Sequence, residues 1–286
     1  MIQQYEKVAV IGAGTMGNGI AHVFAQHGYD VVLIDISEAA LERALMVIGK
    51  NMDRQIKKEK ITEADKAAAL ARLSTSTQMV DAVKDRDLIV EAATERQNLK
   101  ESIFKDLDQA APAHAILATN TSSISITEIA AVTNRPSQVI GMHFMNPVPM
   151  MKLVEIISGY DTSKQVLDDI IALSEDLSKV PVSVNDYPGF VANRILMPMI
   201  NEAIYSLYEG VAEVEAIDTV MKLGMAHPMG PLQLADFIGL DVCLAILNVL
   251  YDGFGNPKYA PCPLLRNMVA AGHLGRKTGK GFYEYE

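Results

Sequence analysis

The glycine-rich segment 12–17 constrains the fold of this chain more than any other part of the sequence. It reads Gly-Ala-Gly-Thr-Met-Gly, directly after a β-branched run at 7–12 and at the start of a helix predicted over 16–26. Glycines so spaced permit a tight turn, close backbone approach to a pyrophosphate, and close packing of helix on strand. The segment therefore predicts the first strand–turn–helix unit of a nucleotide-binding sheet.

An acidic residue supports this interpretation. Asp35 ends the second predicted strand, roughly 20 residues after the first glycine, where a carboxylate can bind an adenosine ribose and repel a 2′-phosphate. The helix N-terminus adds N–H groups and a favourable dipole for phosphate. We therefore expect NAD, in preference to NADP, to be bound by the turn, the helix start and the second strand: Gly12, Gly14, Thr15, Met16, Gly17 and Asp35.

Short apolar runs alternate with helical stretches through the first part of the chain. Strands are predicted over 7–12, 30–34, 88–91, 116–119 and 139–143. Their hydrophobicity is continuous, as a parallel sheet covered by helices on both faces requires. The expected fold class is therefore α/β, a Rossmann-type doubly wound sheet, and the first domain is predicted over residues 1–186.

A long connection follows the second strand. Residues 37–59 and 63–73 are predicted as two helices, with Thr62 and Asp65 as the start signal of the second, and 74–77 as a short strand. Such a helical hairpin insertion would project beyond the sheet as an arm over a ligand. A helical insertion without a function fits the pattern equally well.

Beyond residue 186 the pattern becomes helical. The helix predicted over 190–209 is apolar on more than one face, which is typical of the centre of a bundle or of a subunit interface. Further helices are predicted over 214–223, 232–238, 240–250 and 264–271. We therefore expect an all-α C-terminal domain over residues 187–286 that also forms a homodimer.

Composition excludes several classes of protein. The 286 residues include 25 Lys and Arg against 35 Asp and Glu, and the net charge of −10 disfavours nucleic-acid binding. Two cysteines without a Cys-x-x-Cys pair indicate neither a disulfide framework nor a zinc site, so no metal is expected. No apolar run approaches the ~18 residues of a membrane span, and the N-terminus lacks a signal-peptide pattern. We expect a soluble cytoplasmic protein with no membrane partner.

Two polar segments end neighbouring predicted strands. Ser122 belongs to the first and His143 to the second, and ligands of an open parallel sheet lie beyond the carboxyl ends of its strands. Glu155 lies in an apolar segment, 152–157, that could run back alongside. Because an unpaired buried carboxylate is costly, the imidazole is its expected partner. A single histidine is more often structural, but this position favours function.

These motifs together resemble the L-3-hydroxyacyl-CoA dehydrogenase family, most of all its short-chain bacterial branch, the 3-hydroxybutyryl-CoA dehydrogenases. The resemblance covers nearly the whole chain. Its motifs are Val-Ile-Gly-Ala-Gly-Thr-Met-Gly, Asn-Thr-Ser-Ser, His-Phe-Met-Asn-Pro-Val-Pro-Met-Met-Lys-Leu-Val-Glu, Pro-Gly-Phe-Val-Ala-Asn-Arg, Met-Gly-Pro and Gly-Arg-Lys-Thr-Gly-Lys-Gly-Phe-Tyr. It implies hydride transfer between NAD and a short (S)-3-hydroxyacyl-CoA or its 3-oxoacyl-CoA.

The resemblance also implies roles for single residues. His143 is the catalytic acid/base, Glu155 its orienting partner, and Ser122 and Asn193 bracket the substrate. This agrees with the chemistry, because histidine exchanges protons near neutral pH and a paired carboxylate stabilises the imidazolium. Besides His143, three further positions match cofactor contacts of the family: Glu95, Lys100 and Asn120.

A basic stripe on the predicted arm matches the phosphates of coenzyme A. Residues 50–60 carry five basic side chains against two acidic ones, and four of the basic ones share a helix face. Asn51 and Lys58 match substrate contacts of the family, and Arg54 lies between them. We expect these three residues to bind an acyl-CoA, although a solvated charged face is the plainer interpretation.

Two other functions stay open. A related NAD-dependent dehydrogenase of a free hydroxy acid or sugar acid would need no basic arm. A non-catalytic NAD-binding structural protein would need no acid/base pair, whereas this chain retains Ser122, His143, Glu155 and Asn193 together.

Overall fold

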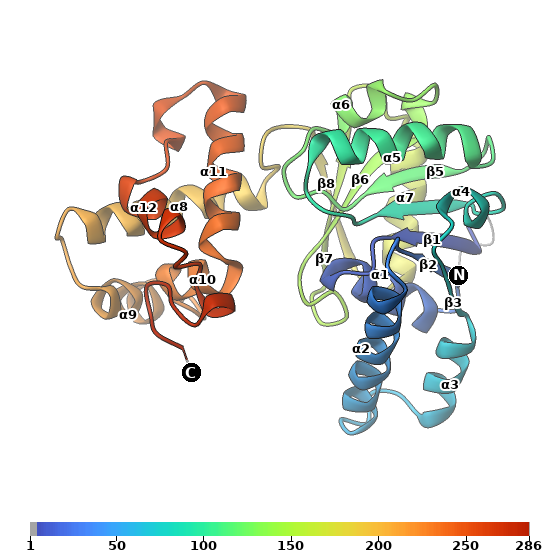
Figure 1. Ribbon diagram of the computed structural model, residues 1–286, viewed down its shortest axis with the longest axis horizontal. Coiled ribbons are helices and arrows are strands. Elements are labelled where there is room, and N and C mark those ends of the chain that lie inside the picture. The colour runs from blue at the N-terminus through green and yellow to red at the C-terminus, as the bar shows by residue number, and fades with distance from the viewer. Residues whose placement is uncertain (1–4, 286) are drawn as a thin grey trace. The chain divides into compact units, whose positions relative to one another are not determined.

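The computed structural model describes residues 5–285 and divides the chain into two compact units. The first unit ends at Asp186 and the second begins at Tyr187. Figure 1 traces both along the chain, from blue to red.

The first unit is built on one eight-stranded sheet with the order β3-β2-β1-β4-β5-β6-β7-β8. All neighbouring strands are parallel except β6 and β7, which are antiparallel. The strands are β1 (Lys7–Ile11), β2 (Asp30–Ile34), β3 (Leu73–Ser76), β4 (Leu88–Glu91), β5 (Ile116–Thr119), β6 (Val139–Phe144), β7 (Leu153–Ser158) and β8 (Val180–Asn185). The α/β doubly wound prediction is confirmed.

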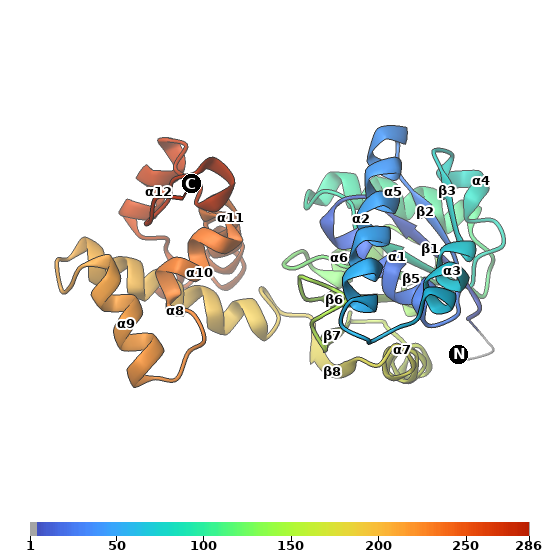
Figure 2. The same ribbon diagram turned by 90° about the horizontal axis from the view of Figure 1, so that it is seen from below.

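Helices cover both faces of this sheet. Figures 1 and 2 show α1 and α2 on one face and α5 and α6 on the other. The helices of the first unit are α1 (Thr15–Gln26), α2 (Glu38–Ile56), α3 (Glu63–Ala71), α4 (Met79–Ala82), α5 (Gln97–Ala110), α6 (Ile126–Ala131) and α7 (Lys164–Asp176). The continuous apolar runs of the central strands are thus explained, since β4, β5 and β6 are buried on both faces, whereas the edge strands β3 and β8 carry exposed residues.

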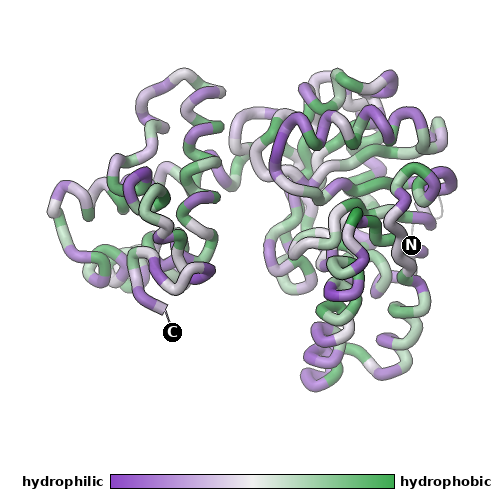
Figure 3. Tube along the Cα trace, viewed as in Figure 1, coloured by the Kyte–Doolittle hydropathy of each residue, from purple (hydrophilic) through white to green (hydrophobic). Residues whose placement is uncertain are grey.

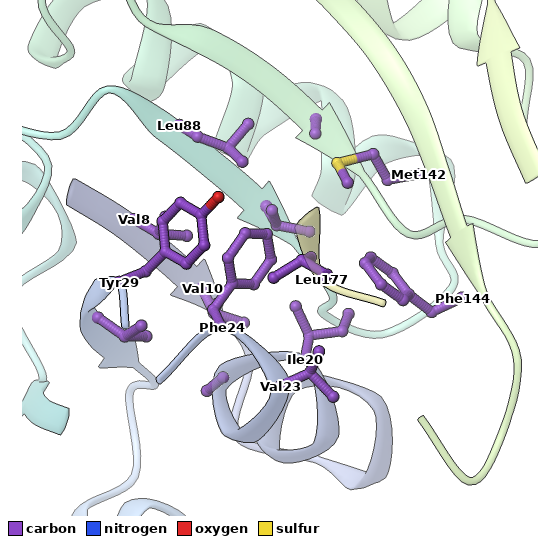
Figure 4. Close-up of a cluster of buried hydrophobic side chains, with 14 of the residues drawn as sticks. Val8, Val10, Ile20, Val23, Phe24, Tyr29, Leu88, Met142, Phe144 and Leu177 are labelled. Atoms are coloured by element: carbon purple, nitrogen blue, oxygen red, sulfur yellow. The ribbon is translucent and has the colours of Figure 1, made fainter. Parts of the chain in front are cut away.

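A large hydrophobic cluster joins the sheet to α1 (Figure 4) and also includes residues of α2, α3 and α7. Val8 and Val10 of β1 are fully buried, and Phe24 of α1 meets Tyr29 edge to face, with ring centroids 5.3 Å apart. Each such side chain stabilises the fold by about 1.5–3 kcal/mol when taken out of water. This packing holds α1, and with it the glycine turn, rigidly against the sheet.

The helical hairpin insertion is present as α2 and α3. Both extend away from the sheet in Figure 1, with their connection at the far end. Thr62 and Asp65 form the expected capping box. Two predicted bounds are wrong. The chain turns with Glu59 at φ 54°, so α2 ends at Ile56 and Lys58 lies in the turn that follows; Leu73 begins β3 and is not part of α3.

The second unit is all-α, as expected. Its helices are α8 (Ala192–Tyr208), α9 (Val214–Gly224), α10 (Pro231–Ile238), α11 (Leu240–Phe254) and α12 (Pro263–Ala270). They share one hydrophobic core, in which Cys243 and Cys262 are buried free thiols. The helix predicted from Phe190 begins later, because Phe190 has φ 50°. Within residues 5–285 no single helix could span a membrane; α10 and α11 pass that test only as a pair bent by 98°.

Candidate functional site

The glycine turn has the geometry of a nucleotide site. Gly12 has φ 98°, and a Cβ added there would lie 2.6 Å from the carbonyl oxygen of Ala92. A Cβ at Gly17 would lie 1.7 Å from the carbonyl oxygen of Gly12, so only glycine lets α1 approach the turn this closely. At Gly14, by contrast, nothing lies within 4 Å of an added Cβ, and no side chain caps α1. Open space therefore faces the helix N-terminus, as a pyrophosphate requires.

This turn lines a pocket of about 840 Å³. Asp35 lies on its wall with both carboxylate oxygens fixed by backbone: Oδ2 accepts from Ala13 N at 2.8 Å and Oδ1 from Ser37 N at 2.9 Å. Thr15 and Met16 also line it. A carboxylate held in this way faces the pocket at the place where an adenosine ribose is expected.

The same pocket has apolar walls that sequence reasoning missed. Ile36 is 97% exposed beside Asp35, and Val47 of α2 and Met79 of α4 line the same space. Such exposure is costly unless a ligand covers these side chains, and an adenine ring has the flat apolar surface to do so. No pattern in the sequence marks them, because an exposed apolar residue in a loop or on a helix looks like a core residue. Shape and chemistry together fit NAD.

His143 and Glu155 lie directly opposite each other on β6 and β7. The Nδ1 of His143 lies 2.7 Å from Oε2 of Glu155, and both side chains are buried. Since a carboxylate only accepts hydrogen bonds, Nδ1 carries a proton in this pair and proton exchange falls to Nε2. The expected pairing is therefore present, because the antiparallel turn after β6 brings the glutamate back beside the histidine.

The ends of β5 and β6 are tied together by Asn120, whose Oδ1 accepts a hydrogen bond from Phe144 N at 2.9 Å. Asn120 is thus placed between the strand that carries His143 and the loop that carries Ser122. The loop itself is held by Glu95, whose Oε1 lies 2.9 Å from Ser122 N and 2.5 Å from Thr121 Oγ1.

The carboxylate of Glu95 is charged when it holds this loop. Burial raises the pKa of this carboxyl, but the charge of Lys100 and the hydrogen bonds from Thr121 and Ser122 outweigh burial, so its pKa lies below the ordinary value. Glu95 therefore stays ionised near neutral pH and keeps accepting from the loop.

Lys100 is buried in ion pairs, a placement the sequence did not reveal. It lies on α5 with 1% of its surface exposed, and its Nζ lies 2.7 and 2.8 Å from the two carboxylate oxygens of Glu91. A third contact, at 3.3 Å, reaches Glu95. Sequence reasoning missed Glu91, because a glutamate after an apolar run reads as the polar end of a strand.

The remaining predicted residues lie elsewhere. Asn193 is in the second unit, in the first turn of α8, with 8% of its surface exposed. Asn51 and Arg54 lie on α2, where Arg54 Nη1 donates to Asn51 Oδ1 at 3.3 Å, and Lys58 follows in the turn. Figure 3 shows hydrophilic residues gathered at this far end of α2. Across residues 5–285, no group of three or more His, Cys, Asp or Glu side chains is arranged to hold a metal ion.

Two family models match this chain, one over each unit. The family model described as 3-hydroxyacyl-CoA dehydrogenase, NAD binding domain, matches residues 7–187. The model of the 3-hydroxyacyl-CoA dehydrogenase C-terminal domain matches residues 189–285.

Individual relatives match over nearly their full length. A 3-hydroxybutyryl-CoA dehydrogenase of Clostridioides difficile is 55% identical over 98% of this chain and 99% of its own. The crystal structure of (S)-3-hydroxybutyryl-CoA dehydrogenase from Ralstonia eutropha, 55% identical, superposes with a TM-score of 0.95 over 99% of both chains. The human mitochondrial hydroxyacyl-coenzyme A dehydrogenase is 43% identical over 98% of this chain and 91% of its own.

Proposed function

The chain belongs to the 3-hydroxyacyl-CoA dehydrogenase family, and we propose how its residues carry out the NAD-dependent interconversion of 3-hydroxybutyryl-CoA and acetoacetyl-CoA. The observation that carries the proposal is the buried 2.7 Å pair of His143 and Glu155 near the carboxyl end of β6. An acid/base pair at this edge of the sheet, in the unit that holds the nucleotide pocket, suits hydride transfer coupled to proton transfer.

In this proposal His143 handles the proton. Bound NAD supplies the hydride acceptor, and NADH the donor, for the carbon that carries the hydroxyl. His143 Nε2 takes the hydroxyl proton in oxidation and returns it in reduction. Glu155 holds the ring and stabilises the imidazolium that forms. Ser122 and Asn193 donate hydrogen bonds to substrate oxygens and orient them, which contributes through positioning.

The residues that line the pocket bind the other parts of NAD in this proposal. Backbone N–H groups at the start of α1 hold the pyrophosphate across Gly14, Asp35 holds the ribose of the adenosine, and Ile36 covers the adenine. Glu95, Lys100 and Asn120 act on the nicotinamide side, where the carboxyl ends of β4 and β5 lie. The fixed carboxylate of Asp35 supports a preference for NAD, since a 2′-phosphate there would meet a negative charge that cannot turn away.

The basic end of the arm binds coenzyme A in the same proposal. Arg54 and Lys58 are exposed, and the chain as a whole carries a net charge of −10, so a local positive patch stands out as a site for phosphate. Asn51, held by Arg54, adds a polar contact beside it.

A homodimer through the second unit completes the proposal. Several of its apolar side chains are exposed, among them Ile195 at 68% and Leu223 at 83%. Apolar surface of this kind favours association. We place the enzyme in the cytoplasm, where reducing conditions suit two free thiols. Sedimentation giving a stable monomer at micromolar concentration would contradict the dimer, and cell fractionation tests the location.

Initial rates test the substrate assignment. Acetoacetyl-CoA, longer 3-oxoacyl-CoA esters and free acetoacetate are compared, each with NADH and with NADPH. The proposal expects the highest kcat/KM with acetoacetyl-CoA and NADH. Comparable rates with free acetoacetate would favour a dehydrogenase of free hydroxy acids, and absence of turnover with every pair would favour a structural NAD-binding protein.

A further inference from the structure

Glu91 is a buried carboxylate for which the proposed mechanism has no use. It ends β4 with none of its surface exposed, and three donors make four hydrogen bonds to its carboxylate. Lys100 Nζ reaches both of its oxygens, Ala93 N donates to Oε1 at 2.7 Å, and Thr119 Oγ1 donates to Oε2 at 2.6 Å. A buried charge is tolerated only when it is paired and hydrogen-bonded as fully as this.

The arrangement leads from Glu91 to the substrate loop. Lys100 lies between two carboxylates, closer to Glu91 at 2.7 Å than to Glu95 at 3.3 Å. Glu95 in turn accepts hydrogen bonds from Thr121 and from the backbone and hydroxyl of Ser122. The position of Lys100 therefore determines the position of the Glu95 carboxylate, and Glu95 holds the loop that carries Ser122.

Charge explains why Glu91 matters here. One cation shared by two carboxylates leaves a net negative charge, and the cation goes to the partner that attracts it most strongly. Here that partner is the fully buried Glu91, because the side chain of Glu95 is 37% exposed and water screens its charge. If Glu91 were neutral, Lys100 would move toward Glu95. Glu95 would then form a closer ion pair with Lys100 and give up its hydrogen bonds with the loop. Ser122 would no longer be held in place.

We propose that Glu91 is a positioning residue: through Lys100 and Glu95 it sets the place of Ser122 for the reaction, and we call this series of contacts the relay. The inference rests on the role proposed above for Ser122. It requires no contact between Glu91 and substrate. Any effect through the nicotinamide contacts proposed for Lys100 and Glu95 should appear in the KM for NADH in both backgrounds. At saturating NADH, removing the charge of Glu91 should affect turnover only where Ser122 is present to be positioned.

A double-mutant cycle of Glu91→Gln and Ser122→Ala tests this, with kcat for acetoacetyl-CoA measured at saturating NADH. Glu91→Gln alone is expected to lower kcat by about 10- to 100-fold, as misplacement of an orienting group does. In the Ser122→Ala background the same change should lower kcat by less than about 3-fold, because coupled residues are not additive. Equal losses in both backgrounds would overturn the relay alone. Wild-type turnover in Ser122→Ala would overturn the role of Ser122 and the relay together.

Asp108→Asn is the matched control. Asp108 lies near the other end of the same helix, α5, and pairs with Arg135 at 2.9 Å. It should lower the melting temperature as Glu91→Gln does, yet leave kcat unchanged. An equal fall of kcat in Asp108→Asn would mean that loosening of α5 explains both, and would overturn the proposal.

A milder variant covers the case in which Glu91→Gln does not fold. Thr119→Val keeps the side-chain shape and removes two hydrogen bonds of Thr119 Oγ1: the 2.6 Å bond donated to Oε2 of Glu91 and the 3.2 Å bond accepted from Thr121 N. We expect a few-fold loss of kcat that disappears in the Ser122→Ala background. The same loss in both backgrounds would overturn the relay here as well.

Discussion

Acidification should destabilise the first unit through His22, a histidine on α1 that the catalytic proposal does not involve. It is fully buried between α1 and α2, where its Nε2 lies 2.9 Å from Gln26 Oε1 and 3.3 Å from Gln55 Nε2. Its Nδ1 is buried without a hydrogen-bond partner among the described residues. Protonation would therefore create a charge with little to solvate it.

The expected magnitude follows from the pKa of His22. Burial is the main cause that lowers it from 6.5 to about 4; the charges of His27 and Lys179 lower it further, and the hydrogen bond with Gln26 opposes them. Between these two values the unfolded chain binds the proton and the folded chain does not. The contribution to stability is thus fully present above pH 6.5 and is lost as the pH falls toward 4. Linkage gives a loss of about 2 kcal/mol between pH 7.5 and pH 5.

Urea unfolding followed by circular dichroism at both pH values measures this loss. Wild type should lose about 2 kcal/mol more than His22→Gln, which cannot titrate at this site. His114→Gln, at an exposed histidine, should behave like wild type. If wild type and His22→Gln lose the same stability on acidification, the buried neutral histidine is not the cause and the reasoning fails.

Three further predictions concern the active site. His143→Gln should lower turnover by about 10²–10⁴-fold with NADH binding intact. Glu155→Gln should lower turnover less, since an amide still orients the imidazole ring but cannot stabilise its charge. Wild-type turnover in either variant would exclude the role of that residue. Gly14→Ala should keep the melting temperature within a few degrees while weakening NADH binding at least ~10-fold in a fluorescence titration. Gly17→Ala should instead destabilise the fold, because a Cβ at Gly17 would clash with the backbone of Gly12 and a Cβ at Gly14 meets nothing. Lys58→Ala should raise KM for acetoacetyl-CoA and leave kcat and NADH affinity unchanged. The rise in KM should become smaller as the salt concentration increases, because salt screens the charge of Lys58. An equal effect on a truncated thioester without the nucleotide would point to fold stability instead.

Local patterns alone determined much of this protein. The glycine spacing at 12–17, the continuous apolar strands and the Thr62–Asp65 capping box each act within a few residues, so the sequence shows them directly. The predicted sheet, arm and helical second unit follow from them. The arm is the limit of this reasoning: helix periodicity carried the prediction past Ile56, but the backbone turn at Glu59 ends the helix there.

Only the tertiary structure decided which buried polar groups face each other. Glu91 and Lys100 are separated by one loop and the start of α5, and nothing in their spacing predicts a fully buried pair with Glu95 beside it. His22 reads as one more residue of an amphipathic helix until α2 closes over it. The cost of burying a charge depends on every group around it, and these groups come from distant parts of the chain. Hydrophobic periodicity indicates which face of a helix or strand is buried. The residues that pack against that face are known only from the tertiary structure.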